Sequence, residues 1–192
     1  MKDPFKLALG LTLLLVIAGG AMMLKGTDAT PVKTASTAQT GDEAQQPGHG
    51  SGAIQWQAFD KGLAQAAAEK KLVMVEFFAT WCGYCKKMDE QVFPDERVQA
   101  QLSKYFVPVR VTESSENQVT FQGKPVTEKA LTPQFGVTGF PTLVFLDAEG
   151  EPITKIPGFV EADTLQGVLQ FIGTGAYEKM DYPTFQKEHL AS

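Results

Sequence analysis

The sequence has few of the residues that bind metals or form disulfides. Its 192 residues include two cysteines, Cys82 and Cys85, and two histidines, His49 and His189. A structural zinc site takes four ligands, usually two cysteine pairs or one pair with histidines. Covalent haem requires a histidine directly after the second cysteine, and this chain has Lys86 there. The composition therefore argues against both kinds of site, and we expect no metal and no cofactor.

The chain also lacks an excess of basic residues. It carries 17 Lys and Arg against 22 Asp and Glu, for a net charge of -5. The whole of this charge lies in residues 54–192, where 13 basic residues face 18 acidic ones. Proteins that bind nucleic acids carry basic patches, so we expect no nucleic-acid partner.

An uncharged, apolar run occupies residues 7–24, "LALGLTLLLVIAGGAMML". As a helix it would be about 27 Å long, enough to cross the hydrocarbon core of a bilayer. Lys2 and Lys6 precede it and favour a cytoplasmic N-terminus. The alternative is a cleaved signal peptide, with small residues at 18–21 as the peptidase site. Both alternatives export the remainder of the chain, to a compartment where disulfides persist. We therefore predict that residues 1–25 form a membrane anchor or signal segment.

Residues 26–53 lack aromatic side chains and are rich in Thr, Ala, Gln, Gly and Pro. Such a segment cannot bury enough apolar surface to offset the entropy of ordering. We predict a flexible linker, with His49 as part of it and not as a ligand.

Residues 54–175 alternate helical and strand-like patterns. Apolar, β-branched runs predict strands at 71–79, 106–111 and 141–147, and a weaker edge strand at 152–158. Helices are expected at 59–71, 82–92, 95–105 with Asp95 as N-cap, within 126–136, and at 162–175. The polar segment 114–124 predicts a loop or small hairpin.

This order predicts an α/β fold with a mixed central sheet and helices on both faces. Helical crossovers join the first three strands, which we therefore expect to be parallel. A tight turn joins the last two, which should be antiparallel.

The cysteine pair follows a strand that is expected to be buried. Cys82 opens a helix, whose free N–H groups and partial positive charge stabilise a thiolate and lower its pKa below about 8.5. Cys85 lies one turn later and is expected to be more enclosed. A purely structural disulfide across so short a loop would constrain the unfolded chain very little. We therefore predict a redox pair in which Cys82 attacks and Cys85 resolves.

Three segments resemble the thioredoxin superfamily. They are "VEFFATWCGYCKKM", which resembles its active-site segment, "GFPTLVFLD", which resembles its cis-proline segment, and "EGEPITKIPGF", which resembles the hairpin that follows. The resemblance covers roughly residues 54–175 and implies the thioredoxin fold. The run "CKKMDEQVFPDERV" is similar to exported members of the superfamily, among them periplasmic disulfide-interchange reductases and sulfur-oxidation thioredoxins.

The resemblance implies roles for residues on both segments. Pro141 falls at the cis-proline position, where the backbone of Gly139 and Phe140 is left free to pair with a substrate strand. An ordinary trans proline at a strand boundary is the alternative. Substrate-binding residues are expected at Trp81, Gly83, Tyr84, Gly139 and Phe140.

Glu76 stands where the superfamily has a buried acid. An isolated buried carboxylate has a raised pKa, so Glu76 could exchange a proton with Cys85 during the reaction. The alternative is a partly exposed strand residue that is paired with Arg110.

The chain departs from the superfamily pattern in three places. Tyr84 replaces the usual proline between the cysteines, which leaves the redox potential open. The segment before "LTPQFG" is longer by roughly ten residues, so the 114–124 loop either selects partners or is inert surface. Residues 176–192 form a tail in which Phe185 and Leu190 are expected to cap the core.

We expect a thiol-disulfide oxidoreductase that acts on exported proteins, with its redox domain in the periplasm or otherwise outside the cytoplasm, tethered to the inner membrane by a single span. Reduction is favoured, because "CGYC" has no histidine that would stabilise a thiolate. A membrane electron-transfer protein would then be a suitable donor. The alternatives are a disulfide oxidase or isomerase, and a non-catalytic binding or holdase module.

Overall fold

The computed structural model describes residues 54–190. The expected anchor or signal segment, 1–25, and the linker, 26–53, with His49, lie outside these residues and stay predictions. Within 54–190, none of the helices is both long enough and apolar enough to span a membrane.

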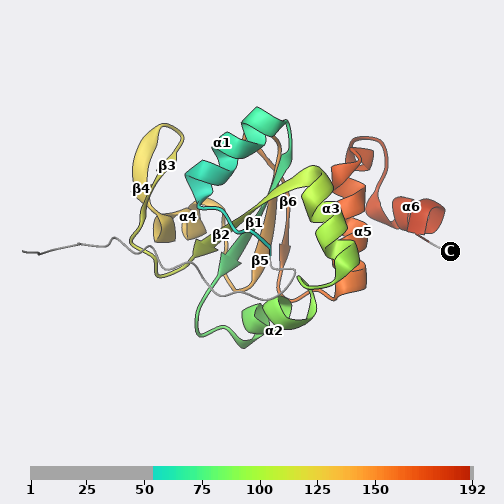
Figure 1. Ribbon diagram of the computed structural model, residues 1–192, viewed down its shortest axis with the longest axis horizontal. Coiled ribbons are helices and arrows are strands. Elements are labelled where there is room, and N and C mark those ends of the chain that lie inside the picture. The colour runs from blue at the N-terminus through green and yellow to red at the C-terminus, as the bar shows by residue number, and fades with distance from the viewer. Residues whose placement is uncertain (1–53, 191–192) are drawn as a thin grey trace, which may run out of the picture. The chain divides into compact units, whose positions relative to one another are not determined.

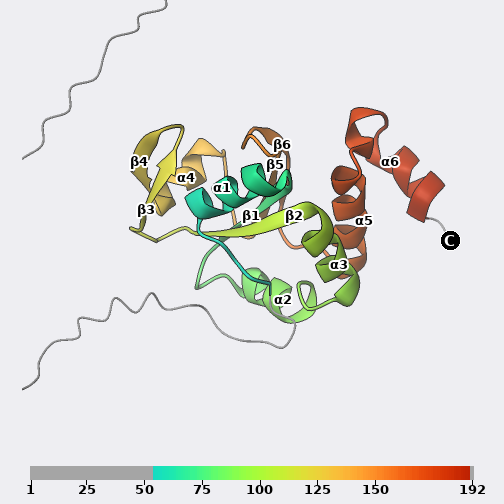
Figure 2. The same ribbon diagram turned by 45° about the horizontal axis from the view of Figure 1, so that its top comes forward.

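Helices surround a central sheet, and a separate hairpin lies at one side (Figures 1 and 2). The helices are α1 (Phe59–Glu69), α2 (Gly83–Gln91), α3 (Glu96–Tyr105), α4 (Glu128–Gln134), α5 (Ala162–Gly173) and α6 (Tyr182–Phe185), with a 3-10 turn at Ala176–Glu178 and a π turn at Gln186–Leu190. The strands are β1 (Leu72–Phe78), β2 (Phe106–Thr112), β3 (Gln118–Phe121), β4 (Lys124–Thr127), β5 (Thr142–Leu146) and β6 (Pro152–Pro157).

The central sheet is mixed and has the strand order β2-β1-β5-β6. β1 and β2 are parallel, whereas β5 is antiparallel to β1 and β6 is antiparallel to β5. The expectation of three parallel strands is therefore wrong. α4 has seven residues and is about 10 Å long, whereas a seven-residue strand spans about 23 Å. Such a short helix cannot return the chain along the length of the sheet. β5 therefore starts at the same end of the sheet at which β2 finishes.

Side chains of β1 alternate between two cores. Val73, Val75 and Phe77 point to the face that α1 and α4 cover, and Met74 points to the face that α2, α3 and α5 cover. α3 and α5 lie side by side on this second face (Figures 1 and 2). Glu76 has the same parity as Met74, so it faces the layer that contains the cysteine helix.

The segment 114–124 contributes to a hairpin, which is one of its two predicted forms. β3 pairs with β4 around Gln122 and Gly123, both with positive φ. This pair of conformations suits a two-residue hairpin turn. Val119 and Phe121 attach the hairpin to the core below α1 and α4.

The tail packs on the domain. Phe185 is buried and its ring lies 5.2 Å from that of Phe171 in α5. Leu190 comes close to Gly167 of the same helix, where an added Cβ would meet its side chain at 2.7 Å. Both predicted capping residues therefore contact α5.

Candidate redox site

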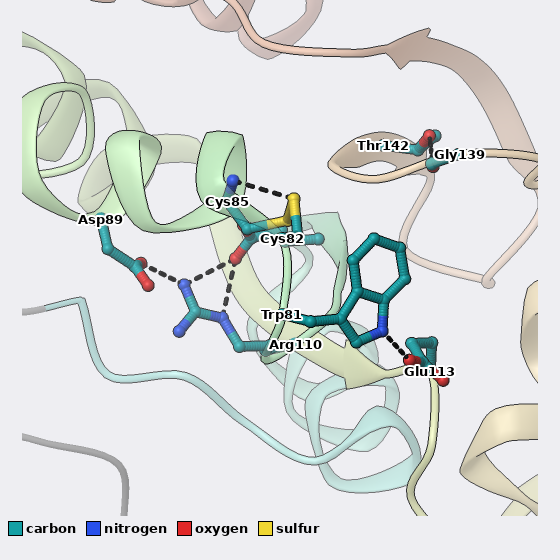
Figure 3. The surroundings of a disulfide bond; sticks show 9 residues. Trp81, Cys82, Cys85, Asp89, Arg110, Glu113, Gly139 and Thr142 are labelled. Carbon is teal, nitrogen blue, oxygen red and sulfur yellow. Dashed lines mark hydrogen bonds and ion pairs between the residues drawn. A yellow bond between two sulfur atoms is a disulfide. The ribbon is translucent and has the colours of Figure 1, made fainter.

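The cysteines lie at the start of α2 and are joined in a disulfide (Figure 3). Cys82 is the N-cap residue, and its sulfur accepts a hydrogen bond from the backbone N–H of Cys85 at 3.0 Å. Cys85 is fully buried, whereas Cys82 keeps a 5% exposed fraction. An incoming sulfur can therefore reach Cys82 more easily than Cys85. Within residues 54–190 no group of three or more His, Cys, Asp or Glu side chains is placed to hold a metal ion.

The Phe140–Pro141 peptide bond is cis. Phe140 packs against the small cluster that Ala79 and the two cysteines form, so the proline loop adjoins the disulfide. The expectation that the backbone of Gly139 is free needs a correction, because its carbonyl accepts a hydrogen bond from the Thr142 hydroxyl at 2.8 Å (Figure 3). One lone pair of that carbonyl remains for a partner strand.

Aromatic side chains surround the disulfide. Trp81 and Tyr84 are 69% and 62% exposed, although large aromatic side chains are normally well covered. The Trp81 ring meets that of Phe140 edge-on at 5.8 Å, and the Tyr84 ring lies 5.9 Å from that of Phe159. Gly83, between them, is exposed and adds no side chain. The predicted substrate-binding residues of both segments thus share one surface, to which the structure adds Phe159.

Glu113 holds Trp81 in place. The indole N–H donates to the Glu113 carboxylate at 2.6 Å (Figure 3). Glu113 directly follows β2, at the end of the sheet where β1 also finishes. Its backbone N–H donates to the Phe78 carbonyl. Sequence reasoning missed this residue, because the contact spans 32 positions and no local pattern signals it.

Glu76 is both buried and paired. It lies opposite Arg110 in the parallel β1–β2 register, and the Arg110 Nε–H donates to its Oε2 at 2.7 Å. The Glu76 side chain has no exposed surface, and that of Arg110 is 11% exposed. The two alternatives, a buried acid and a partner of Arg110, are thus combined, although the predicted partial exposure is wrong.

Arg110 also binds Asp89, which lies on α2 one turn beyond Cys85 (Figure 3). Residues four apart on a helix share a face, so Asp89 extends from the Cys85 side of α2 toward the sheet. The network Glu76–Arg110–Asp89 therefore connects the central strand with the cysteine helix. The sequence reasoning missed Asp89, although its spacing from Cys85 was an available signal.

Burial raises the pKa of Glu76 to about 7 from 4.5. The Arg110 cation opposes this rise, and the negative charge of Asp89 adds to it. The second oxygen, Oε1, is buried and accepts no hydrogen bond from the described residues. An acid with a pKa near neutrality can exchange protons at physiological pH, so these properties suit the predicted proton-transfer role.

The comparisons with known proteins agree with this geometry. A family model described as a thioredoxin-like domain matches residues 59–173. The thiol:disulfide interchange protein DsbD of Pseudoalteromonas atlantica is 32% identical over 107 residues, a match that covers 54% of this chain and 16% of the relative. The chain thus matches only about a sixth of the length of that relative.

Two solved structures share the fold. A thioredoxin from Thermus thermophilus is 26% identical with a TM-score of 0.53, over 72% of this chain and 98% of that one. A thioredoxin-fold protein from Helicobacter pylori is 22% identical with a TM-score of 0.52, over 62% of this chain and 80% of that one, and it supports the fold alone. With its mixed sheet, its disulfide at the start of α2 and a family match over residues 59–173, the chain belongs to the thioredoxin-like domain family.

Proposed function

We propose that this protein is a thiol-disulfide oxidoreductase that reduces disulfides of exported proteins. The observation that carries the proposal is the Cys82–Cys85 disulfide at a helix N-terminus, beside exposed aromatic side chains and above a buried acid. The homology of this chain to proteins named thiol:disulfide interchange protein supports the same chemistry.

The reaction starts from the reduced pair. The Cys82 thiolate attacks one sulfur of the partner's disulfide, which forms a mixed disulfide and releases the partner's other sulfur as a thiolate. Cys85 then loses its proton to Glu76 and attacks the Cys82 sulfur. This step releases the second partner thiolate and leaves the Cys82–Cys85 disulfide. Two electrons have passed to the partner, and a donor dithiol must return two electrons to the pair.

The partner would bind over the aromatic surface around the disulfide. Trp81, Tyr84 and Phe140 supply apolar contacts, and the backbone at Gly139 supplies a carbonyl for strand pairing beside Pro141. Gly83 allows close approach to Cys82 because it carries no side chain. The hairpin of β3 and β4 lies outside this set and would add selectivity for particular partners.

The charges near the cysteine pair favour reduction of partner disulfides over oxidation of partner thiols. Glu76 and Asp89 carry two negative charges when ionised, and Arg110 returns only one positive charge. A net negative environment disfavours a thiolate. The reduced pair therefore gains little stability from ionisation, and the disulfide is a weak oxidant. "CGYC" also has no histidine that would stabilise the thiolate.

We place the redox domain outside the cytoplasm, tethered to the inner membrane through residues 1–25. The uncharged run at 7–24 and the two lysines before it support this location. A membrane electron-transfer protein would be the donor in this arrangement. Protease accessibility of the domain in intact spheroplasts tests it, and a domain protected from protease would contradict it.

Two measurements test the function. A Cys85→Ser variant should accumulate mixed disulfides with its partners on Cys82, and a Cys82→Ser variant should not. The reduction potential should lie nearer to about -270 mV, as for a reductant, than to about -120 mV, as for an oxidant. A potential at the oxidising end, with rapid oxidation of a reduced test protein, would replace the reductase proposal with an oxidase. Absence of trapped partners would favour a binding module.

A further inference from the structure

Arg110 is held by aromatic rings as well as by carboxylates. Its guanidinium carbon lies 4.2 Å from the centre of the Trp56 ring and 4.6 Å from that of Phe78. Cation–π contacts of this kind are strongest where water is excluded, and the Arg110 side chain is only 11% exposed. The direction of Arg110, toward Glu76 and Asp89, therefore depends on the rings around it.

Trp56 lies in a short segment that precedes the residues matched by the family model. The family match begins at residue 59, three positions after Trp56. The next residue, Gln57, extends the sheet edge: its N–H donates to the Pro108 carbonyl at 2.9 Å, and its carbonyl accepts from the Arg110 N–H at 3.2 Å. The Trp56 ring also meets that of Phe93 edge-on at 5.1 Å. Trp56 is thus held by the pairing of its neighbour Gln57 with β2 and by its own ring contacts with Arg110 and Phe93.

We propose that Trp56 is a positioning residue of the redox site, which holds the Arg110 guanidinium against Glu76 and so determines the pH at which Glu76 gains or loses its proton. Without the ring, Arg110 has water and the partly exposed Asp89 as alternative partners. Glu76 has no such alternative, because it is fully buried and its Oε1 already lacks a partner among the described residues.

The other groups around Glu76 leave Arg110 as the decisive charge. On its own sheet, Glu76 is flanked by Arg110 in β2 and by the uncharged Leu143 in β5. From α2, Asp89 approaches, and its charge acts on Glu76 in the opposite direction to that of Arg110. A loosened Arg110 therefore leaves Glu76 with less positive charge, and the carboxyl should keep its proton to higher pH.

The sharpest variant is Trp56→Leu. Leucine keeps apolar bulk next to Phe93 and admits less water than alanine would, but it has no ring face for the guanidinium. Trp56→Ala would also admit water, which lowers the pKa of a buried acid and acts against the loss of Arg110. Trp56→Phe is the matched control, because it keeps an aromatic face.

The experiment is an infrared titration of the Glu76 carboxyl in the oxidised full-length protein, with the band assigned by its loss in Glu76→Gln. We expect Trp56→Leu to raise the titration midpoint by roughly half a pH unit, Trp56→Phe to leave it nearly unchanged, and Arg110→Gln to raise it further. In the Arg110→Gln background, Trp56→Leu should have no further effect. An unchanged or lowered midpoint in Trp56→Leu, or the same shift in both backgrounds, would overturn the proposal.

The inference rests on the proposed function only for its consequence, which is that the pH dependence of disulfide exchange should follow the same shift. The infrared titration needs no exchange activity. A protein that fails to reduce any disulfide but shows the expected midpoints would refute the function and leave the positioning role of Trp56 standing. Active disulfide exchange with unchanged titration midpoints would support the function and refute the positioning role of Trp56.

Discussion

Two of the carboxylates that arginines bind in this protein lie in contrasting places: Glu76 is inside the domain and Asp95 is on its surface. The Arg110 Nε–H donates to Glu76 at 2.7 Å, and an Arg97 Nη2–H donates to Asp95 at the same distance. The pKa values nevertheless move in opposite directions, because burial raises that of Glu76 to about 7, whereas the hydrogen bonds from Arg97 lower that of Asp95 to about 2.

The difference shows what an ion pair does in each setting. Asp95 is solvated and caps α3 by accepting a hydrogen bond from the Arg97 backbone N–H at 2.9 Å. The hydrogen bonds from Arg97 outweigh the smaller effect of desolvation on its charge. Glu76 has lost all contact with water, and one arginine shared with Asp89 does not compensate for that loss. The surface pair stabilises a helix end, whereas the buried carboxyl has a pKa of about 7, which suits the proton transfer that we propose.

The largest effect is expected when the cation is removed from the buried pair. Arg110→Gln leaves Glu76 buried beside only Asp89, so at pH 8 the free energy of unfolding should fall by about 3 kcal/mol. At pH 5 the loss should be smaller, because Glu76 is then protonated. Urea denaturation at both pH values measures this, with Arg97→Gln as the surface control, which should lose much less stability. Equal losses in both variants would mean that burial does not distinguish the pairs.

Glu76→Gln should change how stability depends on pH. Between pH 4.5 and about 7 the folded protein binds a proton at Glu76 that the unfolded chain has released. Stability therefore falls as pH rises through this window, by up to about 3 kcal/mol. The glutamine variant should lack this fall and be more stable than the wild type at pH 8. Urea midpoints of the oxidised proteins, in which the cysteines do not titrate, measure the two curves; parallel curves would contradict the prediction.

A moderate effect is expected at the surface pair. Asp95→Ala removes the α3 cap and should cost about 1 kcal/mol, whereas Asp95→Asn keeps a capping oxygen and should cost less. Because the pKa of Asp95 is lowered, the stability from its charge is complete above about pH 4 and is lost as pH falls through about 2. The asparagine variant and the wild type should therefore converge in acid. Thermal denaturation between pH 2 and 6 is the measurement. A stability difference between the two proteins that widens as the pH falls would contradict the lowered pKa of Asp95.

The smallest effect on stability is expected for Asp89→Asn. The charge of Asp89 raises the pKa of Glu76, so its removal should lower the titration midpoint of the Glu76 carboxyl. Arg110 would then serve Glu76 alone. The same infrared titration measures this shift, with Glu90→Gln on the exposed side of α2 as control. A midpoint that rises would mean that Asp89 acts mainly by keeping Arg110 in place.

Local sequence signals predicted much of the site. The cysteine pair at a helix start, the central position of β1, the Asp95 cap and the edge position of β6 are all confirmed. Each depends on neighbouring residues or on the apolar character of one segment. The direction of β5 could not be predicted in the same way, because it depends on how far α4 carries the chain, and α4 proved shorter than a crossover requires.

The environment of Glu76 shows the same limit. An acid within an apolar strand predicted either burial or a pair with Arg110, and the structure has both. Asp89, Glu113, Phe159 and Trp56 reach the site from four different segments. Only Asp89 could have been inferred, from its helical spacing to Cys85. The others meet the site through the packing of distant segments, which no single-sequence pattern records.

By itself, the sequence determined the reactive pair and its place at a helix start, because capping and strand formation are decided by adjacent side chains. Only the tertiary structure decided how that pair is tuned. The pKa of Glu76 depends on complete burial, on an arginine opposite it in the neighbouring strand and on a carboxylate from the cysteine helix. We propose that it also depends on Trp56, which precedes the residues that the family model matches. Water exclusion and charge act through space, so their balance at the site exists only once the chain has folded.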